Sequence, residues 1–185
     1  MVREGRNSLD RSLTQAVPFH AVNRPHHPGY VEDLQRHHLI PRALPEQRCF
    51  VSLFAALGNR AGFHDFRRNG MLLPAREAAA VRMRLPLHRG PHRTYSEMVA
   101  ERLGEIERDW SRGRDRRGAA NAIADLQRAL RRELLSPRRT LSLNARDPLG
   151  RGVDFSGIDA LADLLWGATQ PRYGAVFSES AAIAA

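Results

Sequence analysis

The chain has 185 residues, of which 42% are hydrophobic, enough for one domain with its own core and appended segments. Its formal net charge is +9, and every basic residue other than histidine is arginine, because the sequence contains no lysine. This excess favours a polyanionic partner over a membrane surface, since no long basic amphipathic helix stands out. Arginine without lysine, together with abundant alanine, also fits a GC-rich coding background, so charge alone does not establish such a partner.

A single cysteine, Cys49, excludes an internal disulfide and a multi-cysteine zinc site. It lies in the apolar run that continues through Phe54, which predicts a buried thiol. No apolar run is long enough to span a bilayer, and the N-terminus lacks the apolar core of a secretory signal. We therefore expect a soluble protein, either cytoplasmic or exported by a specialised secretion system without a cleavable signal peptide.

The first elements follow from proline, glycine and apolar spacing. Residues 1–30 are polar and interrupted by prolines, which predicts an irregular arm. Residues 31–35 allow a short turn, and residues 39–41 form an extended segment that ends at a proline. Apolar residues within 45–57 recur on one helical face, and Gly58 follows them as a stop. Residues 70–74 predict a second extended segment after a turn at Asn69.

The second half is predicted to be mainly helical. Alanine-rich residues 75–83 allow one or two helical turns, and the strongest periodicity predicts a helix over about 91–111. Its apolar stripe consists of Tyr95, Met98, Val99, Leu103, Ile106 and Trp110. A further helix is expected over 119–135, with Ile123, Leu126, Leu130 and Leu134 on one face. Beyond it, the pattern allows a strand at 140–143 and a short helix at 158–166.

Three segments carry residues suited to chemistry on phosphate esters. They are Arg36-His37-His38-Leu39-Ile40-Pro41, Arg68-Asn69-Gly70-Met71-Leu72-Leu73-Pro74 and His88-Arg89-Gly90-Pro91-His92-Arg93-Thr94-Tyr95. Hydrolysis of a phosphodiester needs a deprotonated water and positive charge near the phosphate. Imidazole can supply both, as a base near neutral pH and as a neutral ligand for a divalent metal.

The spacing of these residues suits the two roles. Neighbouring histidines on an extended segment point to opposite sides, so one of His37 and His38 could bind metal while the other reaches the attacking water. His88 and His92 are four residues apart and could converge on one cation if the turn between them is helix-like. The amide of Asn69 could hydrogen-bond backbone carbonyls and the imidazole of the base.

In this order, the motifs resemble those of the HNH, or ββα-metal, endonuclease superfamily. Within it, they look like the AHH branch, which is common among bacterial polymorphic toxins. The resemblance covers roughly residues 30–108 and implies an endonuclease that hydrolyses nucleic acid, DNA in preference to RNA, with one divalent metal ion (Zn, Mg, Mn or Ni). It implies the following roles: His38 as general base, Asn69 as the residue that orients it, and His37, His88 and His92 as metal ligands.

The resemblance also implies an α+β, mostly helical fold, with a ββα-metal finger embedded among additional helices. The finger would consist of a short β-hairpin and the helix at about 91–111. We expect an arm at 1–30, a nuclease domain at 31–111 and a helical C-terminal extension at 112–185 whose role is open. Arg36 stands where the branch has alanine. His38 and Asn69 are 31 residues apart, so the hairpin must carry an insertion, expected to be the helix at 46–57.

Several other readings stay open from the sequence. The histidines could instead stabilise a non-catalytic zinc module that binds nucleic acid or protein. As a nuclease, the chain could be a toxin held inactive by an immunity protein. Arg89 and Arg93 flank the proposed ligands and could bind phosphate or simply face solvent. The pair His26-His27 imitates the active pair, but prolines surround it and no apolar strand follows.

Overall fold

The computed structural model describes residues 15–89, 92–136 and 143. Within these ranges the chain is mostly helical around one two-stranded antiparallel sheet, which confirms the predicted α+β class. Short 3-10 helices lie at η1 (Phe19–Ala21), η2 (Leu44–Glu46) and η3 (Gly58–Ala61). The α-helices are α2 (Val51–Leu57), α3 (Phe66–Asn69), α4 (Glu77–Met83), α5 (Arg93–Gly113) and α6 (Arg116–Leu135).

The sheet consists of β1 (Leu34–His38) and β2 (Gly70–Pro74), with His37 opposite Met71 and His38 opposite Gly70. The second strand lies where the sequence predicted it. The first ends before the predicted extended segment at 39–41, which is not part of a strand, and it includes residues 34 and 35, where a turn was predicted. The reason is that the apolar β2 provides a hydrogen-bonding partner for a polar segment that has no apolar alternation of its own. Pairing continues past the strand ends, since the Leu39 amide donates to the Asn69 carbonyl at 2.8 Å.

The connection between the strands holds η2, α2, η3 and α3, so the predicted insertion is present. The helix expected at 46–57 is shorter than predicted and begins at Val51. Cys49 lies just before it and is exposed, so the prediction of a buried thiol was wrong. The buried apolar face of this segment begins one residue later, at Phe50, which is 3% exposed.

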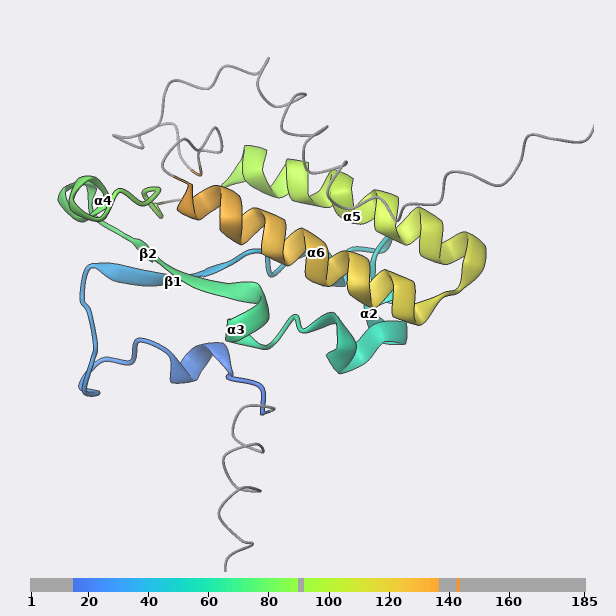
Figure 1. The fold of residues 1–185 in the computed structure, drawn as a ribbon, viewed down its shortest axis with the longest axis horizontal. Coiled ribbons are helices and arrows are strands. Elements are labelled where there is room, and N and C mark those ends of the chain that lie inside the picture. Colours follow the sequence, from blue (N-terminus) through green and yellow to red (C-terminus); the bar gives the residue numbers. More distant parts are fainter. Residues whose placement is uncertain (1–14, 90–91, 137–142, 144–185) are drawn as a thin grey trace, which may run out of the picture.

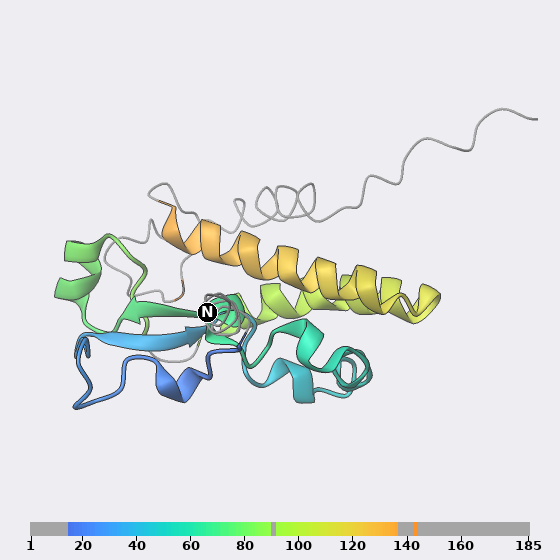
Figure 2. The same ribbon diagram turned by 60° about the horizontal axis from the view of Figure 1, so that its bottom comes forward.

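Helices α5 and α6 run antiparallel beside each other and cover the hairpin and its connection (Figures 1 and 2). The predicted stripe of α5 is buried, with Ile106 partly exposed, and all four predicted residues of α6 are buried. Helix α5 begins at Arg93 because His92 has non-helical backbone angles (φ −104°, ψ 59°) and serves as its N-cap residue. Helix α6 begins earlier than predicted because Asp115 accepts hydrogen bonds from the first free amides of the helix.

The end of the arm is attached to the rest of the domain. The Val17 amide donates to the Asp65 carboxylate at 3.0 Å, and the Phe66 amide donates to the Val17 carbonyl at 2.7 Å. The predicted helix at 75–83 is present as α4. The segments at 140–143 and 158–166 lie outside the described residues, apart from the buried Leu143. Among the described helices, none has the length and apolarity needed to cross a membrane.

Candidate active site

Three imidazoles from three different elements converge at one end of the hairpin. His37 comes from β1, His88 from the segment after α4, and His92 from the N-cap of α5. The ring centroid of His37 lies 5.0 Å from that of His88 and 5.6 Å from that of His92, and the latter two are 4.8 Å apart. One nitrogen from each ring lies within 4.8 Å of the others.

His37 provides the test of whether this cluster suits a metal. Its side chain is 3% exposed, and its Nε2 atom is buried without a hydrogen-bond partner among the described residues. A buried polar atom without a partner is rare, because it loses its hydration and gains nothing in return. A divalent cation at the centre of the cluster would satisfy that nitrogen. The residues therefore fit a metal.

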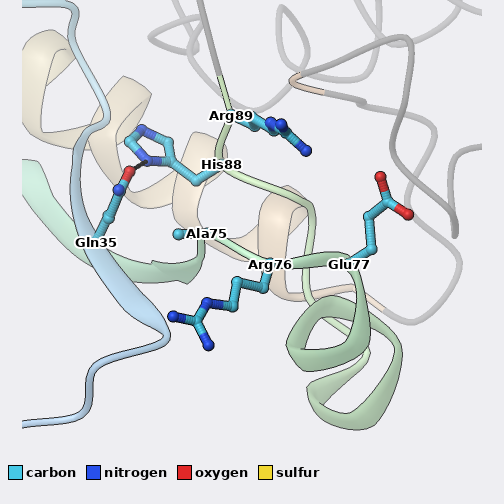
Figure 3. A pocket seen from close by; sticks show the side chains of 6 residues that line it. All are labelled: Gln35, Ala75, Arg76, Glu77, His88 and Arg89. Carbon is cyan, nitrogen blue, oxygen red and sulfur yellow. Dashed lines mark hydrogen bonds between the residues drawn. The ribbon is translucent and has the colours of Figure 1, made fainter.

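Two oxygen atoms hold the other two rings from outside the cluster. The Nδ1 atom of His88 lies 3.2 Å from Gln35 Oε1, and the Nδ1 atom of His92 lies 2.9 Å from the Leu143 carbonyl oxygen (Figure 3 shows the first pair). Both oxygens can only accept, so each Nδ1 carries the proton and each Nε2 keeps its lone pair. Outer partners of this kind fix the tautomer and orientation of metal-binding histidines.

The nitrogen atoms of the three rings, within 4.8 Å of one another, are further apart than the ligand atoms of a bound ion. In a tetrahedral zinc site with Zn–N bonds of about 2.0–2.1 Å, two nitrogens lie about 3.3 Å apart. The rings would therefore have to move slightly together on binding. Three protein ligands with a fourth position open are typical of catalytic zinc sites, whereas structural sites have four protein ligands. Within the described ranges, this is the one such group of three.

The surroundings favour the neutral form of two of these imidazoles, those of His37 and His88. Burial, followed by the nearby His88, lowers the pKa of His37 well below its ordinary value. Burial, followed by His92, lowers the pKa of His88 to about 4. Neutral imidazole is the form that binds a metal, so His37 and His88 are in the form that can do so at neutral pH.

The same shifts predict how stability depends on pH. In the unfolded chain, His37 and His88 titrate near 6.5, whereas in the folded chain they titrate lower, so the unfolded state binds more protons between these values. With divalent metal removed by a chelator, we expect the free energy of unfolding to decrease as pH falls from 6.5 towards 4. Urea denaturation at several pH values measures this. The decrease should be smaller in His88→Ala, and equal pH dependence in both proteins would contradict it.

His38 lies on the opposite face of β1 from the cluster, as expected for neighbouring residues of a strand. Its ring stacks on Phe19 at a centroid distance of 3.7 Å and an interplanar angle of 1°. Burial and the nearby Arg42 and His64 lower its pKa to about 4, so it is neutral and able to accept a proton. The structure therefore brings three of the four predicted histidines together and places the fourth beside them, on the other side of the strand.

The aromatic side chains around His38 were not predicted from the sequence. Phe66 contacts Phe19 edge-on at 5.1 Å. Gly70, the residue paired with His38, lies under the Phe66 ring, and a β-carbon at this position would come within 2.2 Å of that ring. Nothing in the polar arm marked Phe19 as a neighbour of the active pair, because the contact joins residues from separate segments.

Asn69 is fully buried, and most of its hydrogen bonds go to the backbone. Its Oδ1 accepts from the Ile40 amide at 2.8 Å, and its Nδ2 donates to the carbonyls of Ile40 and Phe63 at 3.3 and 3.1 Å. Gln127 of α6 also donates to Oδ1 at 3.4 Å. The expected bond to the imidazole of the base is therefore replaced by bonds to the chain just after β1. Asn69 can influence His38 only by holding that backbone in place.

The predicted phosphate-binding arginines and the histidines of the arm lie outside the three-histidine cluster. Arg93 is 88% exposed and paired with Glu97 at 2.8 Å, and Arg89 lines a pocket of about 590 Å³ beside His88. His26 and His27 are exposed in the arm and do not belong to the three-histidine cluster. The sequence missed the supporting roles of Gln35 and Leu143. Gln35 could have been found, because it precedes His37 by two residues and so shares its face of the strand.

A hairpin and a following helix that bring histidines together define a ββα-type finger, a class of nucleic-acid hydrolase. The chain belongs to the AHH family, described as a nuclease family of the HNH/ENDO VII superfamily with a conserved AHH motif, whose model matches residues 19–130. The protein is therefore a nuclease, and nucleic acid is its substrate. No curated protein and no solved structure matches the chain.

The family motif reads Arg36-His37-His38 in this chain, with arginine in place of alanine. The structure explains why the larger residue fits: Arg36 is exposed, and its Nη1 donates to the carbonyls of Phe19 and Val22 at 3.1 and 3.3 Å. The matched range begins within the arm and ends within α6, so it reaches beyond both predicted limits of the nuclease domain. The division into 1–30, 31–111 and 112–185 itself stays a prediction.

Proposed function

We propose that the chain is a metal-dependent endonuclease that hydrolyses phosphodiester bonds, with DNA as the favoured substrate. The observation that carries this is the buried, unpartnered Nε2 of His37, whose ring contacts two imidazoles with Nδ1 atoms that are already hydrogen-bonded elsewhere. His37, His88 and His92 would hold one divalent ion: Zn, Mg, Mn or Ni. Such an ion supplies positive charge that stabilises the phosphate in the transition state.

The remaining residues have roles set by their contacts. His38 is neutral and would accept a proton from the attacking water, and its stack on Phe19 fixes the plane of the ring while leaving the ring edge free. Asn69 would act as a positioning residue through the backbone after β1. Arg89 and Arg93 would bind the phosphates of the substrate, Arg93 by exchanging its exposed pairing with Glu97, which is a weak interaction.

A nicking assay on supercoiled plasmid tests metal dependence and the base together. We expect cleavage with added divalent metal and none with excess chelator. His38→Ala should reduce the rate by about 10²- to 10⁴-fold, the usual contribution of a general base, while metal affinity measured by calorimetry stays unchanged. Retained cleavage in this variant would remove His38 from the role of base. A single-stranded RNA of matched length, assayed alongside, tests the preference for DNA.

The alternative of a non-catalytic zinc module makes different predictions. It would unfold on chelation and cleave neither substrate. The described part of the chain supplies three protein ligands, the number typical of catalytic zinc sites, which favours catalysis instead. We also propose that the nuclease acts as a toxin that is exported by a specialised secretion system and neutralised by an immunity protein. Arrested growth of a bacterial host that expresses the wild type, but not His38→Ala, is the expected result. Equal growth would contradict the toxin role.

A further inference from the structure

Gln35 reaches the histidine cluster from β1. It lies two residues before His37, on the same face of the strand, and its Oε1 atom is 3.2 Å from His88 Nδ1 (Figure 3). Its backbone is held by pairing with Leu73 of β2. The strand thus places this amide beside the ring of a residue 53 positions further along the chain.

His88 is the least constrained of the three rings. His37 is buried against Tyr95, whose hydroxyl donates to the Leu39 carbonyl at 2.6 Å. The ring of His92 is bonded to a buried backbone carbonyl. His88, in contrast, lies on a segment that is neither helix nor strand, with its amide bonded to the Pro74 carbonyl, and its side chain lines the pocket of about 590 Å³.

The other side chains of that pocket do not take the place of Gln35. Arg76 is paired with Glu32 and Asp33, at 3.0 and 3.3 Å, and a cation could not accept a proton from the ring in any case. Glu77, the other possible acceptor there, begins α4 and points away from His88 in Figure 3. The amide oxygen of Gln35 is therefore the acceptor that the pocket offers to this imidazole.

We propose that Gln35 is a positioning residue for His88: it keeps Nδ1 protonated and turns Nε2 towards His37 and His92. This inference rests on the proposed metal-binding function. Without Gln35, the ring could rotate into the pocket or adopt the other tautomer, and the cluster would have to order it on binding. Loss of such an outer partner typically lowers metal affinity by about 10- to 100-fold.

Two measurements on the full chain test the proposal. The first is calorimetric titration with Zn²⁺ of the wild type, Gln35→Leu, Gln35→Glu and the pocket control Glu77→Ala. We expect about tenfold weaker binding in Gln35→Leu, near wild-type binding in Gln35→Glu, which restores an acceptor, and no change in Glu77→Ala. The second is ¹⁵N NMR of the histidine rings in metal-free protein, which should show His88 protonated at Nδ1 in the wild type and in a mixture of tautomers in Gln35→Leu.

The outcomes separate this proposal from the function on which it rests. Wild-type affinity and an unchanged His88 tautomer in Gln35→Leu would overturn the role of Gln35 and leave the metal site intact. Absence of Zn²⁺ binding by the wild type would overturn the metal site, and with it the purpose assigned to Gln35. Because Gln35 is exposed and leucine is accepted in strands, urea denaturation should show equal stability of the two metal-free proteins.

Discussion

His37→Ala is expected to abolish metal binding and cleavage together. This ring supplies the buried Nε2 atom of the cluster, and two other rings pack against it. Losing an outer partner of a ligand already weakens metal binding by about 10- to 100-fold, so losing the ligand should exceed about 100-fold. Calorimetry with Zn²⁺ and the plasmid nicking assay measure the two effects.

A control with the same chemical change is available in the arm. His27 also belongs to a pair of adjacent histidines, but it is exposed, and its Nδ1 lies 3.0 Å from the carbonyl oxygen of the neighbouring Pro28. His27→Ala should keep wild-type affinity and cleavage. If His37→Ala binds Zn²⁺ as tightly as His27→Ala, the three imidazoles do not form the site.

Asn69→Ala is expected to lower the free energy of unfolding by about 3 kcal/mol or more. The substitution leaves the Ile40 amide and the carbonyls of Ile40 and Phe63 without their partner in a buried region, and each such loss costs about 1–3 kcal/mol. The losses overlap, so they do not simply add. Urea denaturation of chelated protein gives the value.

The matched control for this change is Asn59→Ala. Asn59 is exposed in η3, so its replacement should change stability by less than about 0.5 kcal/mol. A loss of less than about 1 kcal/mol in Asn69→Ala would mean that the network is not needed to hold the chain after β1. A stable variant that had nonetheless lost cleavage would show that Asn69 positions the backbone after β1 for the reaction rather than for the stability of the fold.

The elements with strong local patterns were predicted well from the sequence. Helices α5 and α6 have continuous apolar stripes, which indicated both the type of element and the face that is buried. Strand β2 is an apolar run between a glycine and a proline, which indicated an extended segment. The grouping of His37, His88 and His92 followed from motif order. The start of α5 was misplaced by two residues, because His92 has non-helical backbone angles and serves as the N-cap residue of the helix.

The supports of the site were harder to predict, because they depend on contacts between distant residues. The bond between His92 and the Leu143 carbonyl spans 51 positions, and the stack of Phe19 on His38 joins a polar arm to a strand. Asn69 looked like a partner for an imidazole, since its amide suits that role equally well. Its bonds to Ile40 and Phe63 depend on how the insertion folds back, which no local pattern encodes.

The bond between His92 and Leu143 has a consequence for protein synthesis. A ribosome must polymerise the chain through residue 143, and that stretch must leave the exit tunnel, before the third imidazole acquires its outer partner. Chains that terminate prematurely after α6 would contain all four histidines and yet lack this carbonyl. The outer partner of His92 would therefore be absent until residue 143 has been synthesised and folded back onto the cluster.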